Sequence, residues 1–203
     1  MSIKILLEQR FSCNYFAPGQ DLSLAQINEL IRLATLAPSA YNGQNWRFIA
    51  VHSPKAKQQL QALAYGQEKI GAAAVTIVIC GRLDLHTQLA DTLASSVSAG
   101  ILSQELLSTM VHHATEGYHN QPQRQRDEAI RSASLAAMSL MLAAQEFGLA
   151  SCPMIGFDAE GVSEYLALSN NEIPVMLVTI GQAASNNWPQ KPRKPVHEVL
   201  SFA

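Results

Sequence analysis

Residues 37–46 read Ala-Pro-Ser-Ala-Tyr-Asn-Gly-Gln-Asn-Trp, and this stretch is the most informative in the chain. It lies between an apolar segment with helical spacing and a segment with the character of a strand. Pro38 ends the preceding helix, because a proline disfavours helical geometry in the residue before it. A simple connection needs turn formers, but it has no need of a hydroxyl and several amides together. Because amides carry both donors and acceptors, we interpret the stretch as part of a site for a ring edged with carbonyls and nitrogens.

The segments around this stretch alternate between helices and strands. A capping box, Ser23 to Gln26, begins a helix over residues 24–37. The last of the predicted strands begins with Pro174, where no ladder donor is lost. The predicted strands cover residues 46–52, 75–80 and 174–180, and further helices cover 54–64, 129–147 and a segment from about 158.

The middle and the end of the chain are less regular. Residues 85–116 are helical by composition but poorly periodic, and residues 112–125 are polar and predicted to be mobile. Residues 152–157 are predicted to form a turn, and the tail from Gly181 is predicted to be extended. Because no repeat or linker interrupts the pattern, we expect one domain over residues 1–203.

The composition excludes several classes of function. The net charge of −2 provides no basic field for nucleic acid or anionic lipid. Apolar runs fall short of the roughly 20 residues that cross a bilayer, and no export signal is evident. Only 15% of residues are charged, which favours burial of some surface against another subunit. Three cysteines cannot all pair and show no Cys-x-x-Cys spacing, so we expect a reducing cytoplasm.

Several motifs with a known chemistry are missing from the sequence. There is no Gly-x-Gly-x-x-Gly, P-loop, His-Glu-x-x-His or Gly-x-Ser-x-Gly. His112, His113 and His119 match no standard metal spacing, so we interpret them as solvated histidines and predict no metal site. Cys80 and Cys152 lie in apolar runs and are interpreted as packing residues.

Candidate anion-binding residues stand at opposite ends of the chain. Arg10 and Ser12 supply a guanidinium and a hydroxyl after a short N-terminal helix. Residues 191–194, Lys-Pro-Arg-Lys, supply three positive charges in a proline-stiffened tail. Arginine binds phosphate through paired hydrogen bonds, and lysine adds a point charge. Each segment alone is typical of surface charge, but with the amide-rich turn they describe a phosphate pocket and a ring pocket.

Taken together, these segments resemble the FMN-dependent nitroreductase family over almost the full length of the chain. Four motifs match in order, and Gln67 matches a polar position on the flavin side of the family's site. The four are Arg10-x-Ser12, Pro38-Ser39-x-x-Asn42-x-Gln44-x-Trp46, Pro153-Met154-Ile155-Gly156-Phe157 and Lys191-x-Arg193.

The chain also departs from the family's pattern. Asn14 stands where the family usually has arginine or lysine, and Lys194 could supply the lost charge. Ala40 replaces a serine, and Asn45 replaces a proline, which is expected to loosen the turn. Ile155 stands where one branch of the family carries glutamate, which places the chain outside that branch.

The resemblance implies an α+β fold with a central, mainly antiparallel sheet flanked by helices, in an intertwined homodimer with FMN at the subunit interface. It implies a variable substrate or lid segment at about residues 85–125, where Tyr118, together with Tyr41, could stack on an aromatic acceptor. The amide of Gly156 would donate toward the flavin N5 or O4, and glycine there permits close backbone approach. The implied cofactor-binding residues are Arg10, Ser12, Asn14, Ser39, Asn42, Gln44, Gln67, Pro153, Met154, Ile155, Gly156, Lys191 and Arg193.

The activity implied by the resemblance is that of an NAD(P)H oxidoreductase. In the family, NAD(P)H delivers hydride to the flavin N5 and leaves, and a nitroaromatic or quinone acceptor then takes its place in ping-pong order. The flavin performs the difficult step, which explains why no acid–base pair is evident in the sequence. Two alternatives remain open: a non-catalytic FMN-binding or sensing protein, and a divergent member with reductive dehalogenation or flavin-processing chemistry.

Overall fold

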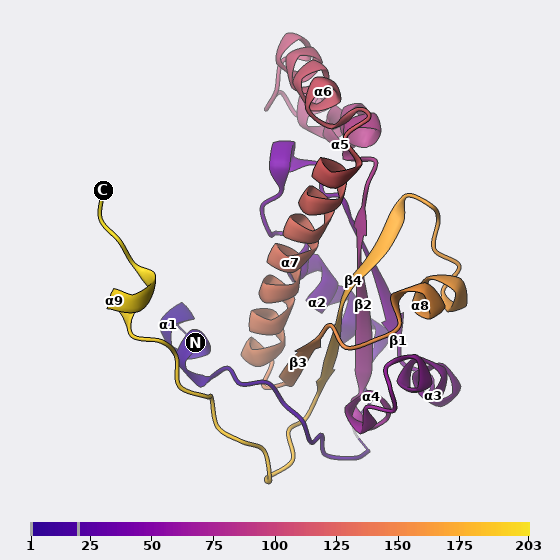
Figure 1. Cartoon of the computed structure of the whole chain (residues 1–203), viewed down its shortest axis with the longest axis vertical. Coiled ribbons are helices and arrows are strands. Elements are labelled where there is room, and N and C mark those ends of the chain that lie inside the picture. Colours follow the sequence, from indigo (N-terminus) through magenta and orange to yellow (C-terminus); the bar gives the residue numbers. More distant parts are fainter. Residues whose placement is uncertain (1, 20) are drawn as a thin grey trace.

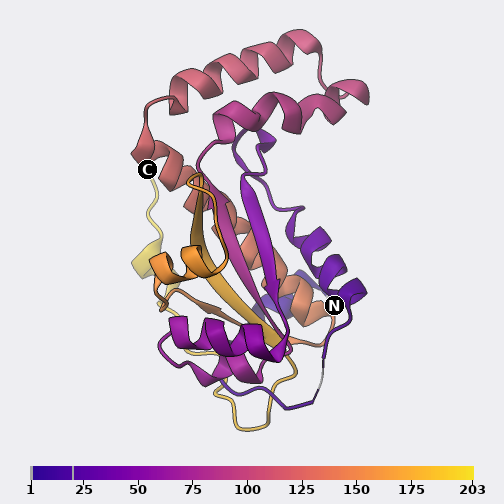
Figure 2. The same ribbon diagram turned by 90° about the vertical axis from the view of Figure 1, so that its right-hand side faces the viewer.

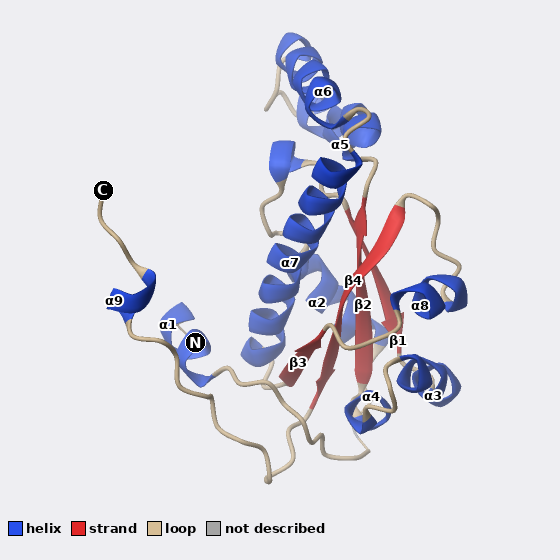
Figure 3. Cartoon of the chain, in the orientation of Figure 1, coloured by secondary structure: helices blue, strands red, loops and turns tan. Residues whose placement is uncertain are grey.

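A computed structural model describes residues 2–19 and 21–203 and contains a central antiparallel sheet (Figure 3). Its described strands follow the order β1-β2-β4-β3, and every neighbouring pair is antiparallel. The predicted α+β class with an antiparallel sheet is therefore confirmed. The strands are β1 (Trp46–Val51), β2 (Val75–Arg82), β3 (Ala150–Met154) and β4 (Glu172–Gly181).

Helices cover both faces of this sheet (Figure 1). One face packs against α2 (Leu24–Ala34) and the long helix α7 (Pro122–Glu146), and the other packs against α3 (Pro54–Leu63) and α8 (Ala159–Tyr165). Alternate side chains of β2 enter the two cores, because successive strand residues point to opposite faces. Ile77 and Ile79 join the core under α2 and α7, whereas Val78 and Cys80 join the core under α3 and α8. The apolar run of β2 is explained by burial on both faces.

Local signals explain where several helices begin. Ser23 and Gln26 form the predicted reciprocal capping box of α2. Ser53 caps α3 and Pro54 occupies its first turn, where the missing N–H costs nothing. The helix α2 ends at Ala34, three residues earlier than predicted, because a turn over residues 35–37 precedes Pro38.

The middle of the chain differs most from the prediction. Residues 85–125 form two helices and the start of a third, in place of one irregular run followed by a mobile segment. The helices α5 (Leu85–Ser98) and α6 (Gln104–Tyr118) make a hairpin that projects beyond the sheet, and α7 begins at Pro122 (Figure 2). Gly100, with φ of +71°, turns the chain between them. The weak periodicity arises because the hairpin buries its apolar residues against itself, in a separate cluster.

Two further expectations were wrong. Residues 150–154 form strand β3, so the predicted turn at 152–157 begins only after Met154. Pro174 is the third residue of β4, not the first, and the register of β2 against β4 shifts between Ile79 and Cys80, beside it. This irregularity accommodates a residue that cannot donate to the ladder.

The segment that follows the N-terminal helix and the first part of the C-terminal tail lie side by side, where Phe16 bridges to Ala183. The N-terminal helix α1 (Ile3–Gln9) precedes a segment that bridges Ser12 to Ser151. After Gly181 the tail is mostly extended, as predicted, but it contains a short helix α9 (Val196–Val199). Remaining short elements are α4 (Glu68–Ala72) and the 3₁₀ turn η1 (Ala40–Asn42), neither of which was predicted. Across the described ranges, no helix combines the length and apolar character needed to span a bilayer.

Candidate active site

The predicted phosphate residues from both ends of the chain line one small cavity. Ser12 is held against β3 by its bridge to Ser151. The Nε2 atom of Gln190 donates to the carbonyl oxygens of Leu7 at 3.0 Å and Arg10 at 2.7 Å, which holds the tail against the N-terminal segment. The cavity has a volume of about 110 Å³, and its lining includes Arg10, Ser12, Asn14, Trp188, Gln190, Lys191 and Arg193.

Arg10 is the member of this group that has a buried side-chain atom without a hydrogen-bond partner among the described residues. This atom is Nη1 of its guanidinium group. The residue lies between the cavity and a second one of about 320 Å³. A buried donor without an acceptor is costly, and a guanidinium pairs especially well with phosphate. The donor set around Arg10 therefore fits the phosphate of a bound cofactor.

A lysine that the sequence reasoning missed contacts Asn14, one of the residues that line this cavity. The Nζ atom of Lys69, on α4, donates to Oδ1 of Asn14 at 2.8 Å and lies 3.8 Å from Sγ of Cys152. Lys69 therefore brings a positive charge beside Asn14, where the family usually has arginine or lysine. Lys194 is exposed, as are Lys191 and Arg193, and it is not among the residues that line the cavity. The one sequence signal was the proximity of Lys69 to Gln67, two residues earlier.

Gln67 and Gly156, both predicted to face the flavin, are in direct contact. The Nε2 atom of Gln67 donates to the carbonyl of Gly156 at 2.8 Å. A Cβ atom on Gly156 would meet only this amide, at 3.6 Å, so the backbone there faces open space. Ile155 beside it is 77% exposed. Gly156 follows Ser151 by five residues, so it lies at most about 17 Å from the Ser12 bridge.

The turn over residues 39–44 is strained. Tyr41, Asn42 and Gln44 have φ of 56°, 51° and 47°, a region that costs non-glycine residues on the order of 1–3 kcal/mol each, and less for asparagine. The Ser39 hydroxyl accepts a hydrogen bond from the Gln44 amide at 2.9 Å. Backbone strain of this kind gathers at functional sites, where the surrounding structure maintains it.

Asn45 supports this turn and does not loosen it, contrary to the expectation. The side chain is only 3% exposed, and its Nδ2 atom donates to the carbonyl of Arg82 at 3.1 Å. The amide of Arg82 donates in return to the carbonyl of Asn45 at 2.8 Å. The residue that replaces the family's proline therefore ties the turn to β2.

The structure does not bring this turn to the phosphate cavity within one chain (Figure 1). The turn precedes Trp46, which pairs with Gly81 at the end of the sheet where Glu172 begins β4. The Ser12 segment lies at the opposite end, where Ala150 pairs with the last residue of β4. Because β4 has ten residues, roughly 30 Å separate the two ends. The predicted ring-edge residues and phosphate residues thus form two groups.

The two predicted substrate tyrosines pack on the same apolar cluster of the α5–α6 hairpin. Tyr41 reaches it from the strained turn, and Tyr118 from the end of α6. Burial raises the pKa of Tyr118, and Glu128 and Tyr41 add to this effect. The Arg124 guanidinium carbon lies 5.8 Å from the centre of the Tyr118 ring. Aromatic and cationic groups therefore gather beneath the hairpin, next to the turn.

The cysteines have the character of packing residues. Cys13, Cys80 and Cys152 are all buried and unpaired. Burial raises the pKa of Cys13 to about 11 and that of Cys80 to about 12. Burial also raises the pKa of Cys152, although Lys69 opposes the shift. In the described part of the chain, no group of three or more histidine, cysteine or acidic side chains could hold a metal ion.

Comparison with known proteins identifies the family. The model of the nitroreductase family matches residues 7–182. The chain belongs to this family. A relative from Bacillus subtilis, MhqN, provisionally named an NAD(P)H nitroreductase, is 36% identical over 199 residues, which cover 97% of each chain.

Solved structures of nitroreductases share the fold. The B. subtilis nitroreductase YdfN has a TM-score of 0.92 and 35% identity, and the match covers 98% of each chain. A nitroreductase from Exiguobacterium sibiricum, solved in complex with FMN, has a TM-score of 0.92 and 25% identity, and the match covers 100% of this chain and 98% of the other. Nitroreductases use FMN with NAD(P)H, so the chain is an FMN-dependent NAD(P)H oxidoreductase of this type.

Proposed function

We propose that this nitroreductase transfers electrons from NAD(P)H to nitroaromatic or quinone-type acceptors in ping-pong order. The observation that supports the flavin site of this proposal is the Nη1 atom of Arg10, which is buried without a partner among the described residues, beside a cavity lined by Ser12, Lys191 and Arg193. Bound FMN supplies the two-electron chemistry, and the protein supplies binding, orientation and electrostatics.

The residues around the cavity would each have a separate role in binding and orienting FMN. Arg10, Ser12, Lys191 and Arg193 would hold the phosphate through charge-assisted hydrogen bonds. Lys69 would present its ammonium group beside Asn14, toward the polar edge of the flavin. Gln67 would keep the Gly156 backbone in place through its 2.8 Å hydrogen bond, with the Gly156 amide free to donate. In this scheme Pro153, Met154 and Ile155 form the wall that carries Gly156, and no side chain has to act as acid or base.

The acceptor site is proposed to lie beneath the hairpin of residues 85–125, within a single domain over residues 1–203. Tyr41 and Tyr118 offer aromatic surface there, and Arg124 adds a positive charge next to Tyr118. A flat, electron-poor ring such as a quinone or nitroaromatic would stack on such a surface.

A second copy of the chain is proposed to complete the site, in an intertwined homodimer. Ser39, Asn42 and Gln44 lie roughly 30 Å along β4 from the phosphate residues, so they would contact the cofactor of the other subunit. The edge of β4 before Leu177 is not paired with β3. The C-terminal residues extend away from the sheet, with Val199 69% and Phe202 91% exposed, and could cover such an edge in the partner (Figure 1).

The proposal can be tested on the purified protein. We expect a yellow protein with one FMN per chain, rapid bleaching by NADH or NADPH, and turnover of quinones and nitroaromatics with parallel double-reciprocal plots. A protein that stays colourless after incubation with FMN would contradict the cofactor site. Bound flavin that NAD(P)H does not bleach would point to the sensing alternative.

The same preparation distinguishes the remaining alternatives. Turnover of halogenated phenols without turnover of quinones would indicate divergent chemistry.

Light scattering during gel filtration should give twice the 22.0 kDa mass of the chain. A monomer with full FMN content would contradict a site that is shared between subunits. Because its three cysteines are unpaired, the proposed location is the reducing cytoplasm.

A further inference from the structure

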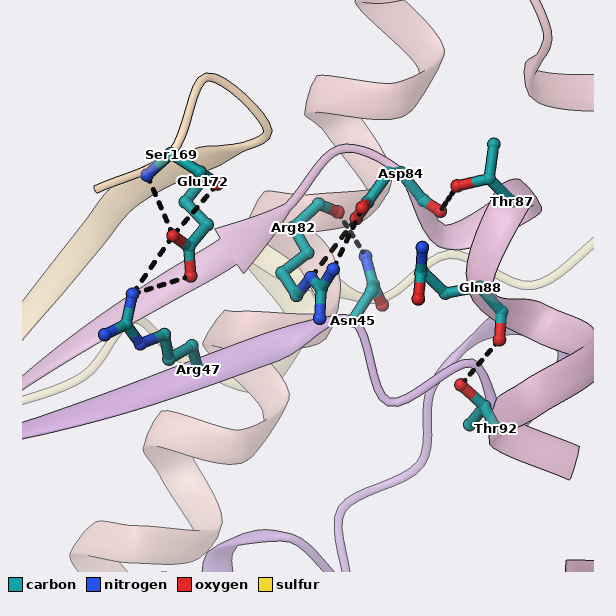
Figure 4. Close-up of polar contacts among 9 residues, drawn as sticks. All are labelled: Asn45, Arg47, Arg82, Asp84, Thr87, Gln88, Thr92, Ser169 and Glu172. Carbon is teal, nitrogen blue, oxygen red and sulfur yellow. Dashed lines mark hydrogen bonds and ion pairs between the residues drawn. The ribbon is translucent and has the colours of Figure 1, made fainter. Parts of the chain in front are cut away.

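The strained turn of residues 39–44 is connected to the hairpin by a chain of polar contacts (Figure 4). Asn45 is the first link: its side-chain amide and its carbonyl both bond to the backbone of Arg82, at 3.1 and 2.8 Å. Arg82 is the second link, because its guanidinium forms two hydrogen bonds with the carboxylate of Asp84. Nε lies 3.2 Å from Oδ1, and Nη2 lies 2.9 Å from Oδ2.

Asp84 stands at the beginning of α5 but does not cap the helix. An aspartate at this position normally accepts a hydrogen bond from the helix N-terminus. No such bond forms here, since the carboxylate is engaged with Arg82. Thr87 donates to the Asp84 carbonyl at 2.9 Å and fixes the residue from the helix side. In place of a helix cap, the Asp84 carboxylate forms an ion pair with Arg82, the strand residue whose backbone binds Asn45.

The first residue of the hairpin also packs directly against the turn. A Cβ atom on Gly43 would lie 2.6 Å from Cδ1 of Leu85, the first residue of α5. Leu85 therefore packs against the turn backbone as closely as a glycine allows. The turn is held by packing at Gly43 and by hydrogen bonds at Asn45, and both lead to the start of α5.

We propose that Asn45, Arg82 and Asp84 are positioning residues that maintain the strained, cofactor-binding shape of the turn and couple it to the hairpin. Strained backbone persists only where surrounding contacts over-determine it, and these residues supply such contacts. Their effect on FMN rests on the proposed function, because it assumes that the turn meets the cofactor. Their effect on the shape of the turn does not depend on the proposed function.

The chain contains a matched control for this test, drawn in the same view (Figure 4). Glu172 is as buried as Asp84, with side chains 8% and 11% exposed, and it binds Arg47 at 3.1 Å. The Glu172 carboxylate also accepts hydrogen bonds from Ser169, and none of these contacts reaches the turn. Asp84→Asn and Glu172→Gln therefore remove similar ion pairs at the same end of the sheet.

The first measurement is amide hydrogen exchange by mass spectrometry on the apoprotein. In Asp84→Asn, a peptide covering residues 39–45 should exchange at least tenfold faster than in the parent, while in Glu172→Gln its rate should not change. Asn45→Ala should reproduce the effect through the other end of the tether. If Asp84→Asn fails to fold, Asn45→Ala decides the question alone. Equal acceleration in the tether and control variants, or none in either, would overturn the proposal.

The second measurement is the dissociation constant of FMN, from quenching of flavin fluorescence. Asp84→Asn should raise it three- to tenfold and alter the visible circular dichroism of the bound flavin. The dissociation constant of Glu172→Gln should stay within twofold of the parent value. The Asn45→Ala/Asp84→Asn double variant should have a dissociation constant no higher than that of whichever single variant binds FMN more weakly. Additive losses would show that the residues do not act through one tether. A parent protein that does not bind FMN would contradict the proposed function alone, because hydrogen exchange would still test the tether.

Discussion

Replacement of Arg10 by glutamine tests the phosphate site most directly. The substitution removes a guanidinium whose Nη1 atom is buried without a partner among the described residues, and it keeps a polar, uncharged side chain at the position. A hydrogen bond to a charged group contributes about 1.5–3 kcal/mol, and 1.36 kcal/mol corresponds to a factor of ten. If the phosphate of FMN is the missing partner, the dissociation constant should rise by roughly 10- to 150-fold.

The same reasoning predicts the opposite behaviour for the apoprotein. Without FMN, Arg10 leaves a donor unsatisfied, so Arg10→Gln should leave the apoprotein's Tm unchanged or raise it slightly. Fluorescence titration with FMN at constant salt and thermal unfolding of apoprotein give the two quantities. Arg32→Gln is the control, because Arg32 pairs with Glu29 on the surface of α2, away from the cavity. Unchanged FMN affinity in Arg10→Gln, or a fall in apoprotein Tm large enough to explain the loss of binding, would refute the assignment.

Three further predictions concern packing, acid stability and thiol reactivity. Gly81→Ala should cost about 1–3 kcal/mol, measured by urea unfolding, because its Cβ would lie 2.6 Å from the Ala129 carbonyl oxygen. Gly117→Ala, inside α6, should be neutral or stabilising, because its Cβ would meet only Nη2 of Arg124, at 3.9 Å. Although burial alone would raise the pKa of Glu172, hydrogen bonds to its carboxylate lower it. Its stabilising contribution should therefore be complete above the unfolded pKa and be lost as the pH falls through the folded value, and Glu172→Gln should flatten the stability profile there. Because burial raises the pKa of Cys13 to about 11, the native thiol should resist aromatic disulfide reagents at pH 8 until denaturant is added, and fast labelling would contradict its packing.

Features that depend on neighbouring residues could be predicted from the sequence. The capping box at Ser23 and the β-branched run of β2 follow from local spacing and propensity, and both lie where the sequence predicts them. The boundaries around residues 99–122 could not be placed, because the hairpin buries its apolar residues against itself and not against the sheet. The strand at Cys152 was hidden by Pro153, which resembles a turn signal but lies at the sheet edge.

The sequence by itself determined the family and the cofactor class, and it predicted the segments that approach the cofactor, since each is carried by residue types at short, fixed spacings. Only the tertiary structure decided which of those segments meet. Gln190 reaches Arg10 across 180 positions, Lys69 donates a hydrogen bond to Asn14, and Asn45 ties to β2 the turn it was expected to loosen. Partners so distant in sequence are chosen by the packing of the sheet and its helices, which no local pattern contains.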